Sequence, residues 1–303
     1  MSGHLTLPIL ALLLWATFMS IPLRRQAGEE RRGSSRFIWW VLTINFVAVP
    51  LLLGILIAIF PFSGPLAFAA SMVLLAPCID YVVTFCGLAG GDSHALLRIT
   101  PLLLGAQAVG VPFYLWLFHL LGLWEMHIPS QALKEAAPSV LAALGTILIP
   151  LALAWVAQQL SARNLPARSW SELAQAVMVP AMMLVLFCTV AAHSAVVWDA
   201  SEQLLWLVGL YAIFATVMSL GLWTATRGRG SVKMPAGERI ALVFSGVTRN
   251  ALVILPVILA LSEITGQTLL PVAVMTQTLV ELVVMVTMVA AFRKAGCKPY
   301  MLK

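Results

Sequence analysis

Leu75-Ala76-Pro77-Cys78-Ile79-Asp80 is the stretch that decides the fold, and it stands in the middle of an apolar run over residues 66–88. A run of this length is what a membrane helix needs, since about 20 apolar residues cross the hydrocarbon of a bilayer. Pro77 removes a helical hydrogen bond, and Asp80 brings a carboxylate to mid-membrane depth. Non-helical backbone at that depth must be buried in protein or line a cavity. The stretch therefore predicts a membrane helix that is broken at its centre.

The composition of the whole chain agrees with a membrane protein. Of 303 residues, 61% are hydrophobic and 10% are charged, whereas a soluble domain has about 25% charged residues. The net charge of +6 comes from Lys and Arg in short loops, which indicates membrane topology rather than nucleic-acid binding. The four cysteines show no CxxC pair and no zinc spacing, so neither a disulfide framework nor a zinc site is expected.

Apolar runs of membrane-spanning length recur along the chain, and the first is interpreted as a retained span rather than a signal peptide. The fold class expected is an all-α polytopic membrane protein with about nine transmembrane helices, in one membrane unit over residues 1–303. The nine runs cover residues 5–23, 37–60, 66–88, 96–123, 140–160, 174–192, 204–226, 240–261 and 269–292.

The positions of the basic residues predict the orientation of these spans. Of the 18 Lys and Arg residues, 15 lie in the loops after the first, fifth and seventh spans or in the C-terminal tail. Loops rich in Lys and Arg remain in the cytoplasm. We therefore expect a multi-pass protein of the cell inner membrane, with its N-terminus outside and its C-terminus in the cytoplasm. An odd number of spans is required for this, and nine supplies it.

A second run is expected to be broken in the same way as the first. Within residues 240–261, the stretch Phe244-Ser245-Gly246-Val247-Thr248-Arg249-Asn250 places a full charge in the membrane before Pro256. The third and eighth spans are five apart, so they run in opposite directions. Interrupted helices in corresponding places of two inverted halves are typical of a carrier's central binding site. The alternative is that Pro77 and Pro256 make ordinary helix kinks.

Asp80, Arg249 and Glu281 are the ionisable residues deep in apolar runs. An unpaired charge at the bilayer centre costs from about 3 to above 10 kcal/mol, so such residues usually face a partner or a cavity. Asp80 and Arg249 occupy the two broken spans, and we expect them to pair, either at a transport site or as a static salt bridge. Glu281 has no obvious partner in the sequence and is expected to take up and release a proton, as a proton-coupled carrier requires.

Cys78 stands two residues from Asp80, beside the predicted break. A buried cysteine is most often a small inert hydrophobe, which is one interpretation. The other is a soft thiolate ligand for a soft solute, such as a metalloid. Cys86 lies eight residues further on, roughly 12 Å away in a helix, too far to share that role.

These stretches resemble a known family. Residues 75–79, continuing to Leu88-Ala89-Gly90-Gly91-Asp92, resemble the fourth-helix signature of the bile acid:sodium symporter superfamily, and most closely its arsenite-efflux branch. Phe244-Ser245 with Arg249-Asn250 looks like the second crossing helix of that superfamily. Leu279-Val280-Glu281 resembles the last-helix glutamate motif of the arsenite carriers. The similarity extends over nearly the whole chain.

The resemblance implies a ten-helix fold of two inverted repeats, in which two broken helices cross. This chain has one span fewer, and alignment of the signatures shows the first helix to be missing. The panel helices would then be 5–23, 140–160 and 174–192, and the core helices would be 37–60, 66–88, 96–123, 204–226, 240–261 and 269–292. By position, Cys78 and Glu281 fall where the arsenite branch keeps its functional cysteine and glutamate.

The chain also departs from the family pattern. Pro77 replaces the arginine that precedes the cysteine in the arsenite carriers, and Leu252 replaces a glutamate. At the sodium-ligand positions of the bile-acid branch, the substituted residues are Ser245, Arg249, Val82 and Val83. A guanidinium repels a nearby sodium ion and can substitute for its charge. Proton coupling is therefore expected rather than sodium coupling.

The function expected is an ion-coupled secondary transporter that exports arsenite or antimonite against proton entry. The alternative is a carrier of an organic anion, with Arg249 as the countercharge. The residues expected to bind substrate or couple ions are Cys78, Asp80, Ser245, Arg249, Asn250 and Glu281, and Cys78 is the candidate metalloid ligand. No cofactor is expected, and the partners would be a small solute and the lipid bilayer, not nucleic acid. HExxH, GxSxG and Walker A motifs are absent from the sequence, so an enzyme is not expected.

Overall fold

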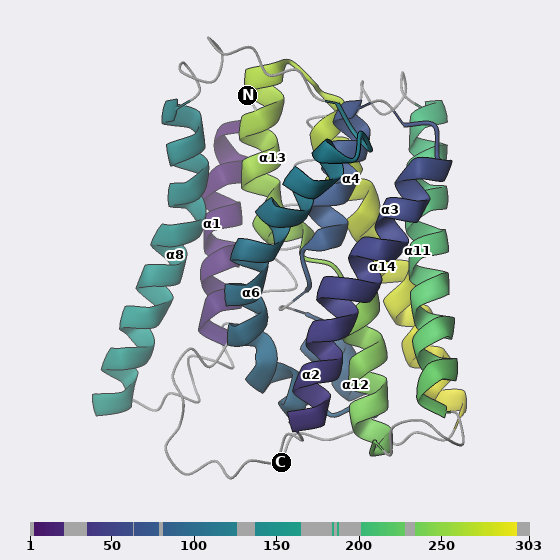
Figure 1. Cartoon of the computed structure of the whole chain (residues 1–303). Coiled ribbons are helices and arrows are strands. Elements are labelled where there is room, and N and C mark those ends of the chain that lie inside the picture. The colour runs from purple at the N-terminus through teal and green to yellow at the C-terminus, as the bar shows by residue number, and fades with distance from the viewer. Residues whose placement is uncertain are drawn as a thin grey trace.

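A computed structural model describes residues 3–20, 35–62, 64–78, 81–125, 137–164, 184, 187, 201–227 and 234–295. Within these ranges the chain is almost entirely helical and contains no β-strand. The helices form an upright bundle, in which most of them run from one end of the molecule toward the other (Figure 1). The helices, in chain order, are α1 (Gly3–Ser20), α2 (Ser35–Thr43), the π-helical turn η1 (Ile44–Ala48), α3 (Val49–Ile59), α4 (Gly64–Leu75), α5 (Val82–Leu88), α6 (Ser93–Leu120), α8 (Ala137–Asn164), α11 (Ser201–Arg227), α12 (Ala236–Val247), α13 (Ala251–Thr265) and α14 (Leu269–Lys294).

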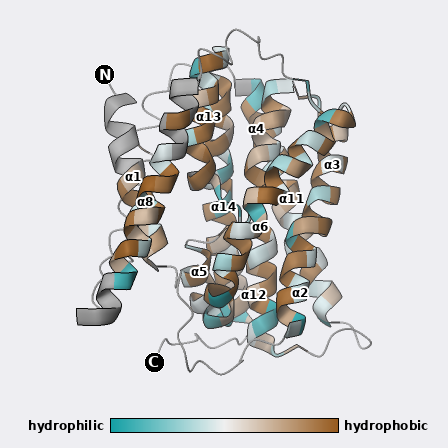
Figure 2. Cartoon of the chain, turned by 60° about the vertical axis from the view of Figure 1, so that its left-hand side comes forward, coloured by the Kyte–Doolittle hydropathy of each residue, from teal (hydrophilic) through white to brown (hydrophobic). Residues whose placement is uncertain are grey.

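Apolar residues predominate along most helices of the bundle (brown in Figure 2), and many of them are exposed on its outside. Leu51, Val109, Leu205 and Val283 are each more than half exposed, which a soluble bundle of this size would avoid. Four helical stretches in the described residues are long and apolar enough to cross a membrane: Ser35–Ile59, Ser93–Leu120, Glu202–Arg227 and Leu269–Lys294. Shorter apolar helices accompany them. The chain is therefore an all-α membrane protein.

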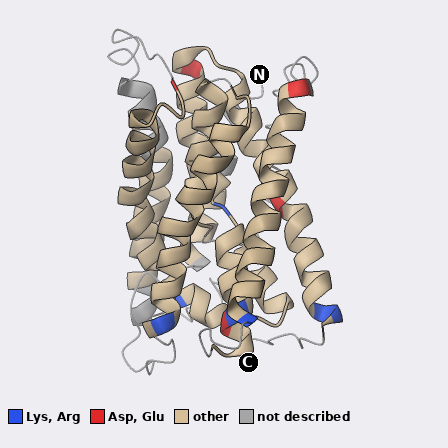
Figure 3. Ribbon diagram, turned by 45° about the vertical axis from the view of Figure 1, so that its right-hand side comes forward, with Lys and Arg blue, Asp and Glu red and all other residues tan. Residues whose placement is uncertain are grey.

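Eight of the nine predicted apolar runs coincide with helices of the described residues. The remaining run, 174–192, lies outside them apart from positions 184 and 187. Figure 3 shows the described Lys and Arg gathered at one end of the bundle, with one exception at mid-height. Arg227, Arg293 and Lys294, for example, stand in the last turns of α11 and α14. The bundle thus has one basic end.

Both interruptions that the sequence predicts are present. α4 ends at Leu75 and α5 begins at Val82, while α12 ends at Val247 and α13 begins at Ala251. Pro77 lies in the first non-helical segment, so it is not a simple kink. Pro256, in contrast, lies inside α13. The second break therefore forms at residues 248–250, without a proline.

The two non-helical segments pair with each other through their main chains. Pro77 and Arg249 form an antiparallel bridge. The Cys78 N–H donates to the Thr248 carbonyl at 3.2 Å, and the Asn250 N–H donates to the Ala76 carbonyl at 2.8 Å. Buried backbone groups that leave a helix need other partners where water is excluded. Each segment supplies the partners that the other requires, and this pairing fixes the point at which the two interrupted helices meet.

The π-helical turn η1 has a local cause and a tertiary effect. Pro50, at the start of α3, has no N–H to donate to the carbonyl of Phe46, four residues earlier. The Tyr114 hydroxyl of α6 donates to that carbonyl instead. In the same turn Asn45 is fully buried. The widened turn thus lies where an amide side chain enters the protein interior, as π-helical turns often do at functional sites.

Candidate functional site

Glu281 of α14 lies at the point where the two interrupted helices meet. Its Oε2 accepts a hydrogen bond from the Arg249 backbone N–H at 2.8 Å, and its Oε1 accepts one from the Tyr81 hydroxyl at 3.0 Å. The Gln277 amide, one turn earlier on α14, also donates to Oε2. Only 3% of Glu281 is exposed. Glu281 has no obvious partner in the sequence because its partners come from segments 200 and 32 residues away, which the order of the sequence does not reveal.

Arg249 has no exposed surface, and its guanidinium is held by uncharged groups. Its Nη2 donates to the carbonyls of Ser245 at 3.4 Å and Gly246, which belong to the last turn of α12. The carbonyls of a last helical turn lack partners within the helix and carry partial negative charge. A cation placed there satisfies them. Arg249 therefore binds the C-terminal end of α12, the half-helix that precedes it in the sequence.

A buried amide completes the surroundings of the guanidinium. Arg249 Nη1 donates to Asn45 Oδ1 at 3.2 Å, and Asn45 Nδ2 donates to Ser245 Oγ at 3.1 Å and to the Val41 carbonyl at 2.9 Å. The ring of Phe214 on α11 lies 5.3 Å from Arg249 Cζ, within cation–π range. Three elements, η1, α11 and α12, thus meet at one charged side chain.

Asn250 starts the second half of the interrupted helix. Its side-chain Oδ1 accepts a hydrogen bond from the Val253 N–H at 3.2 Å, which caps α13. Its Nδ2 is buried and has no hydrogen-bond partner among the described residues. The same residue contributes its backbone N–H to the main-chain pairing described above. Asn250 is therefore a structural member of the site, and its side-chain amide nitrogen has no hydrogen-bond partner among the described residues.

Cys78 is buried in the paired segment, two residues beyond the contact between Ala76 and Asn250. Asp80 lies outside the described residues, so the pair expected between Asp80 and Arg249 stays a prediction. The described residues contain no group of three or more His, Cys, Asp or Glu side chains able to hold a metal ion. Among the described residues, soft coordination at this place would therefore involve the thiolate of Cys78 with neighbours of other kinds.

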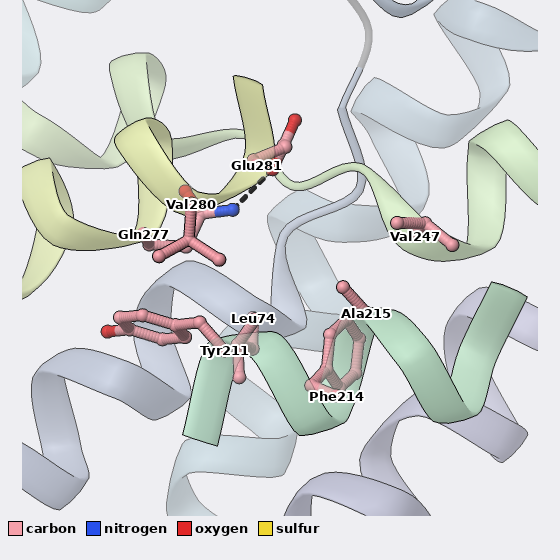
Figure 4. A pocket seen from close by; sticks show the side chains of 8 residues that line it. All are labelled: Leu74, Tyr211, Phe214, Ala215, Val247, Gln277, Val280 and Glu281. Atoms are coloured by element: carbon pink, nitrogen blue, oxygen red, sulfur yellow. Dashed lines mark hydrogen bonds between the residues drawn. The ribbon is translucent and has the colours of Figure 1, made fainter. Parts of the chain in front are cut away.

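A small cavity opens beside Glu281 (Figure 4). Its lining comes from α4, α11, α12 and α14, and consists of Leu74, Tyr211, Phe214, Ala215, Val247, Gln277, Val280 and Glu281. The centre of a water molecule can explore about 10 Å³ of it, which is room for about one water. Gln277 Oε1 is buried and has no hydrogen-bond partner among the described residues. Cys78 is not part of this lining.

The structure thus brings together five of the six residues predicted for the site, namely Cys78, Ser245, Arg249, Asn250 and Glu281. Sequence reasoning missed Asn45, Tyr81 and Gln277. A signal for Gln277 exists, because it precedes Glu281 by four residues and shares its helix face. Asn45 is likewise a single amide in the apolar run 37–60. Tyr81 carries no such signal.

No protein-family model matches this sequence, and no curated protein is detectably similar to it.

Proposed function

We propose that this protein is an ion-coupled secondary transporter whose solute site lies where the two interrupted helices meet. The observation that supports this is the pairing of their non-helical centres around the buried side chains of Arg249 and Glu281. Ionisable residues and unwound backbone inside a membrane are costly, and both mark solute or ion pathways.

The ends of the half-helices support a binding role for this place. The first turn of α13 and the last turn of α12 face the same region, and they carry partial charges of opposite sign. Carriers use such half-helix ends to bind solutes and coupling ions near the bilayer midplane.

The finer architecture of the proposal is that of the bile acid:sodium symporter superfamily. It has nine spans in two inverted repeats, with the first helix of the ten-helix fold missing. The pair α4–α5 runs in the opposite direction to the pair α12–α13, as inverted repeats require (Figure 1). The basic end of the bundle is proposed to face the cytoplasm, with the N-terminus outside and the protein in the cell inner membrane.

One departure from the arsenite branch has a simple interpretation. Pro77 stands where those carriers have an arginine beside their cysteine. In the structure Arg249, in the other non-helical segment, is the backbone bridge partner of Pro77. A guanidinium is thus present at the crossing, although it is supplied by the other interrupted helix. This exchange supports the proposed membership of the arsenite branch.

The substrate proposed is arsenite or antimonite, exported against proton entry. Trivalent arsenic and antimony bind thiolate strongly, and Cys78 lies in the paired segment itself. One thiolate releases its ligand more readily than a cage of three, which suits transport. Glu281 is the proposed proton carrier. The organic-anion alternative requires Arg249 as a countercharge, but its guanidinium already binds carbonyl and amide oxygens of the protein. The arsenite proposal is therefore the better supported.

The test is expression of the gene in a bacterium that lacks its own arsenite exporters. We expect survival on arsenite and a lower cytoplasmic arsenic content, and we expect Cys78→Ser to abolish both effects. The control is Cys86→Ser, which changes an equally buried cysteine of α5 and should leave resistance intact. Immunoblots of membrane fractions must show equal amounts of the variants.

Two outcomes would contradict the proposal at different levels. A wild-type protein that confers no resistance would exclude arsenite as the substrate, and uptake assays with organic anions would follow. If a Cys78→Ser protein still exports arsenic normally, the thiol of Cys78 is not a substrate ligand and serves only in packing.

A further inference from the structure

The guanidinium of Arg249 occupies a cage of neutral oxygen atoms. Asn45 Oδ1 and the carbonyls of Ser245 and Gly246 accept its hydrogen bonds, and the face of Phe214 lies 5.3 Å from its central carbon. Among the described residues, no carboxylate accepts a hydrogen bond from the guanidinium. Glu281 accepts its hydrogen bond from the backbone N–H of Arg249 and acts on the guanidinium only through electrostatic attraction.

Neutral oxygen cages of this kind are suited to small monovalent cations. Carbonyl and amide oxygens replace the hydration shell of such an ion, as in the carbonyl rings of selectivity filters. The helix C-terminus adds negative potential, and the aromatic face adds cation–π attraction. A divalent ion would prefer carboxylates, and none of the described groups that bind the guanidinium is a carboxylate.

We propose that the break between α12 and α13 is a monovalent-cation site whose permanent occupant is the protein's own Arg249 guanidinium. A tethered cation occupies the cage in every state of the protein and cannot be released. The carrier therefore needs no external cation at this place. This consequence for coupling rests on the proposed transport function, whereas the existence of the cation site does not.

The proposal predicts what happens when the occupant is removed. Arg249→Ala retains the backbone N–H that binds Glu281, but it leaves Asn45 Oδ1 and two carbonyls without their donor. Buried acceptors without partners destabilise a protein. The vacated cage then has the ligands for a free cation, and the guanidinium ion reproduces the shape and donors of the lost group. A freely diffusing ion should therefore restore the stability that the tethered one supplied.

The experiment measures thermal unfolding of the purified protein in detergent. Wild type, Arg249→Ala and the control Arg293→Ala, an exposed arginine at the end of α14, are each heated in choline chloride, sodium chloride and non-denaturing guanidinium chloride at equal ionic strength. We expect Arg249→Ala to unfold several degrees below wild type in choline and to regain at least half of that loss in guanidinium. Wild type and Arg293→Ala should unfold at the same temperature in choline and in sodium.

If Arg249→Ala does not fold, a second pair of variants tests whether a cation is needed at this place. Arg249→Lys keeps a tethered cation, whereas Arg249→Met keeps much of the length without charge, so Lys should be clearly the more stable of the two. Equal stability of these variants would overturn the proposal, as would a folded Arg249→Ala that no cation stabilises. Sodium-dependent stabilisation of wild type would also overturn it. None of these measurements involves transport, so they are independent of whether arsenite is the substrate.

Discussion

Glu281 connects three parts of the protein through one carboxyl group. Tyr81 precedes α5, Arg249 lies in the second non-helical segment, and Gln277 stands on the same helix as Glu281. Any change in the charge of this carboxyl group alters its hydrogen bonds to both interrupted helices at once. A proton taken up by Glu281 would therefore act directly on the pairing that holds the crossing together.

Replacing Glu281 tests this link. Glu281→Gln cannot cycle between protonated and charged forms, so we expect proton-driven arsenite efflux in everted vesicles to fall at least tenfold, about 1.4 kcal/mol in the barrier. Tyr81→Phe removes one of three donors and should slow efflux by only a few-fold. Glu263→Gln, at the exposed end of α13, is the matched control. Unchanged efflux in Glu281→Gln would exclude this residue as the proton carrier.

At the scale of residues, the sequence predicts which charges are buried but not what they touch. Burial of Arg249 and Glu281 follows from their place in apolar runs. Their partners do not, because Asn45 and Arg249 are 204 residues apart and meet only through tertiary packing. Polar residues such as Asn45 and Gln277 are also compatible with many positions in a membrane helix, so their types alone do not identify a site.

The stretch from α2 through η1 to α3 shows how a single element depends on a neighbour. Pro50 leaves the Phe46 carbonyl without its helical donor, and Tyr114 of α6 supplies a replacement. The same turn positions Asn45 for its contact with Arg249. The hydroxyl of Tyr114 therefore supports the guanidinium cage from a distance, through the geometry of the π-helical turn.

Removing that hydroxyl gives a prediction at the scale of the element. Tyr114→Phe removes a donor from the Phe46 carbonyl, and we expect it to destabilise the protein by about 1 kcal/mol, the usual size for such bonds in membranes. Thermal unfolding in detergent measures this as a lower midpoint. Phe113→Leu, a neighbouring exposed residue of α6, should change the midpoint less. A Tyr114→Phe protein as stable as wild type would mean that another group satisfies the carbonyl.

The helices themselves were largely predictable, because length and apolar content decide a membrane helix. The positions of the two breaks in the helices were less predictable. Pro77 does mark the first break, but Pro256 lies within α13, where a membrane helix accommodates it. The second break falls instead at residues 248–250, where backbone pairing with residues 76–78 replaces the helical hydrogen bonds. That pairing depends on a partner segment, which local sequence does not specify.

For the molecule as a whole, charge is the feature that sequence and structure share most clearly. The described Lys and Arg residues gather at one end of the bundle (Figure 3), as the loop counts predict. If that end is cytoplasmic, reporter domains fused after Arg36 and after Lys134 should report opposite compartments, the cytoplasm for the first and the outside for the second. Alkaline phosphatase and green fluorescent protein activities would measure this. The same compartment for both fusions would contradict the nine-span topology.

The main-chain pairing at the crossing also has an evolutionary consequence. The hydrogen bonds between residues 76–78 and 248–250 use amide and carbonyl groups that every amino acid except proline possesses in full. Their geometry is therefore largely independent of which side chains stand there. Mutations at Cys78 or Thr248 can change the chemistry of the site while the crossing persists. Under the proposed transport function, a lineage of such proteins can exchange one solute for another by a few substitutions, without inventing a new fold.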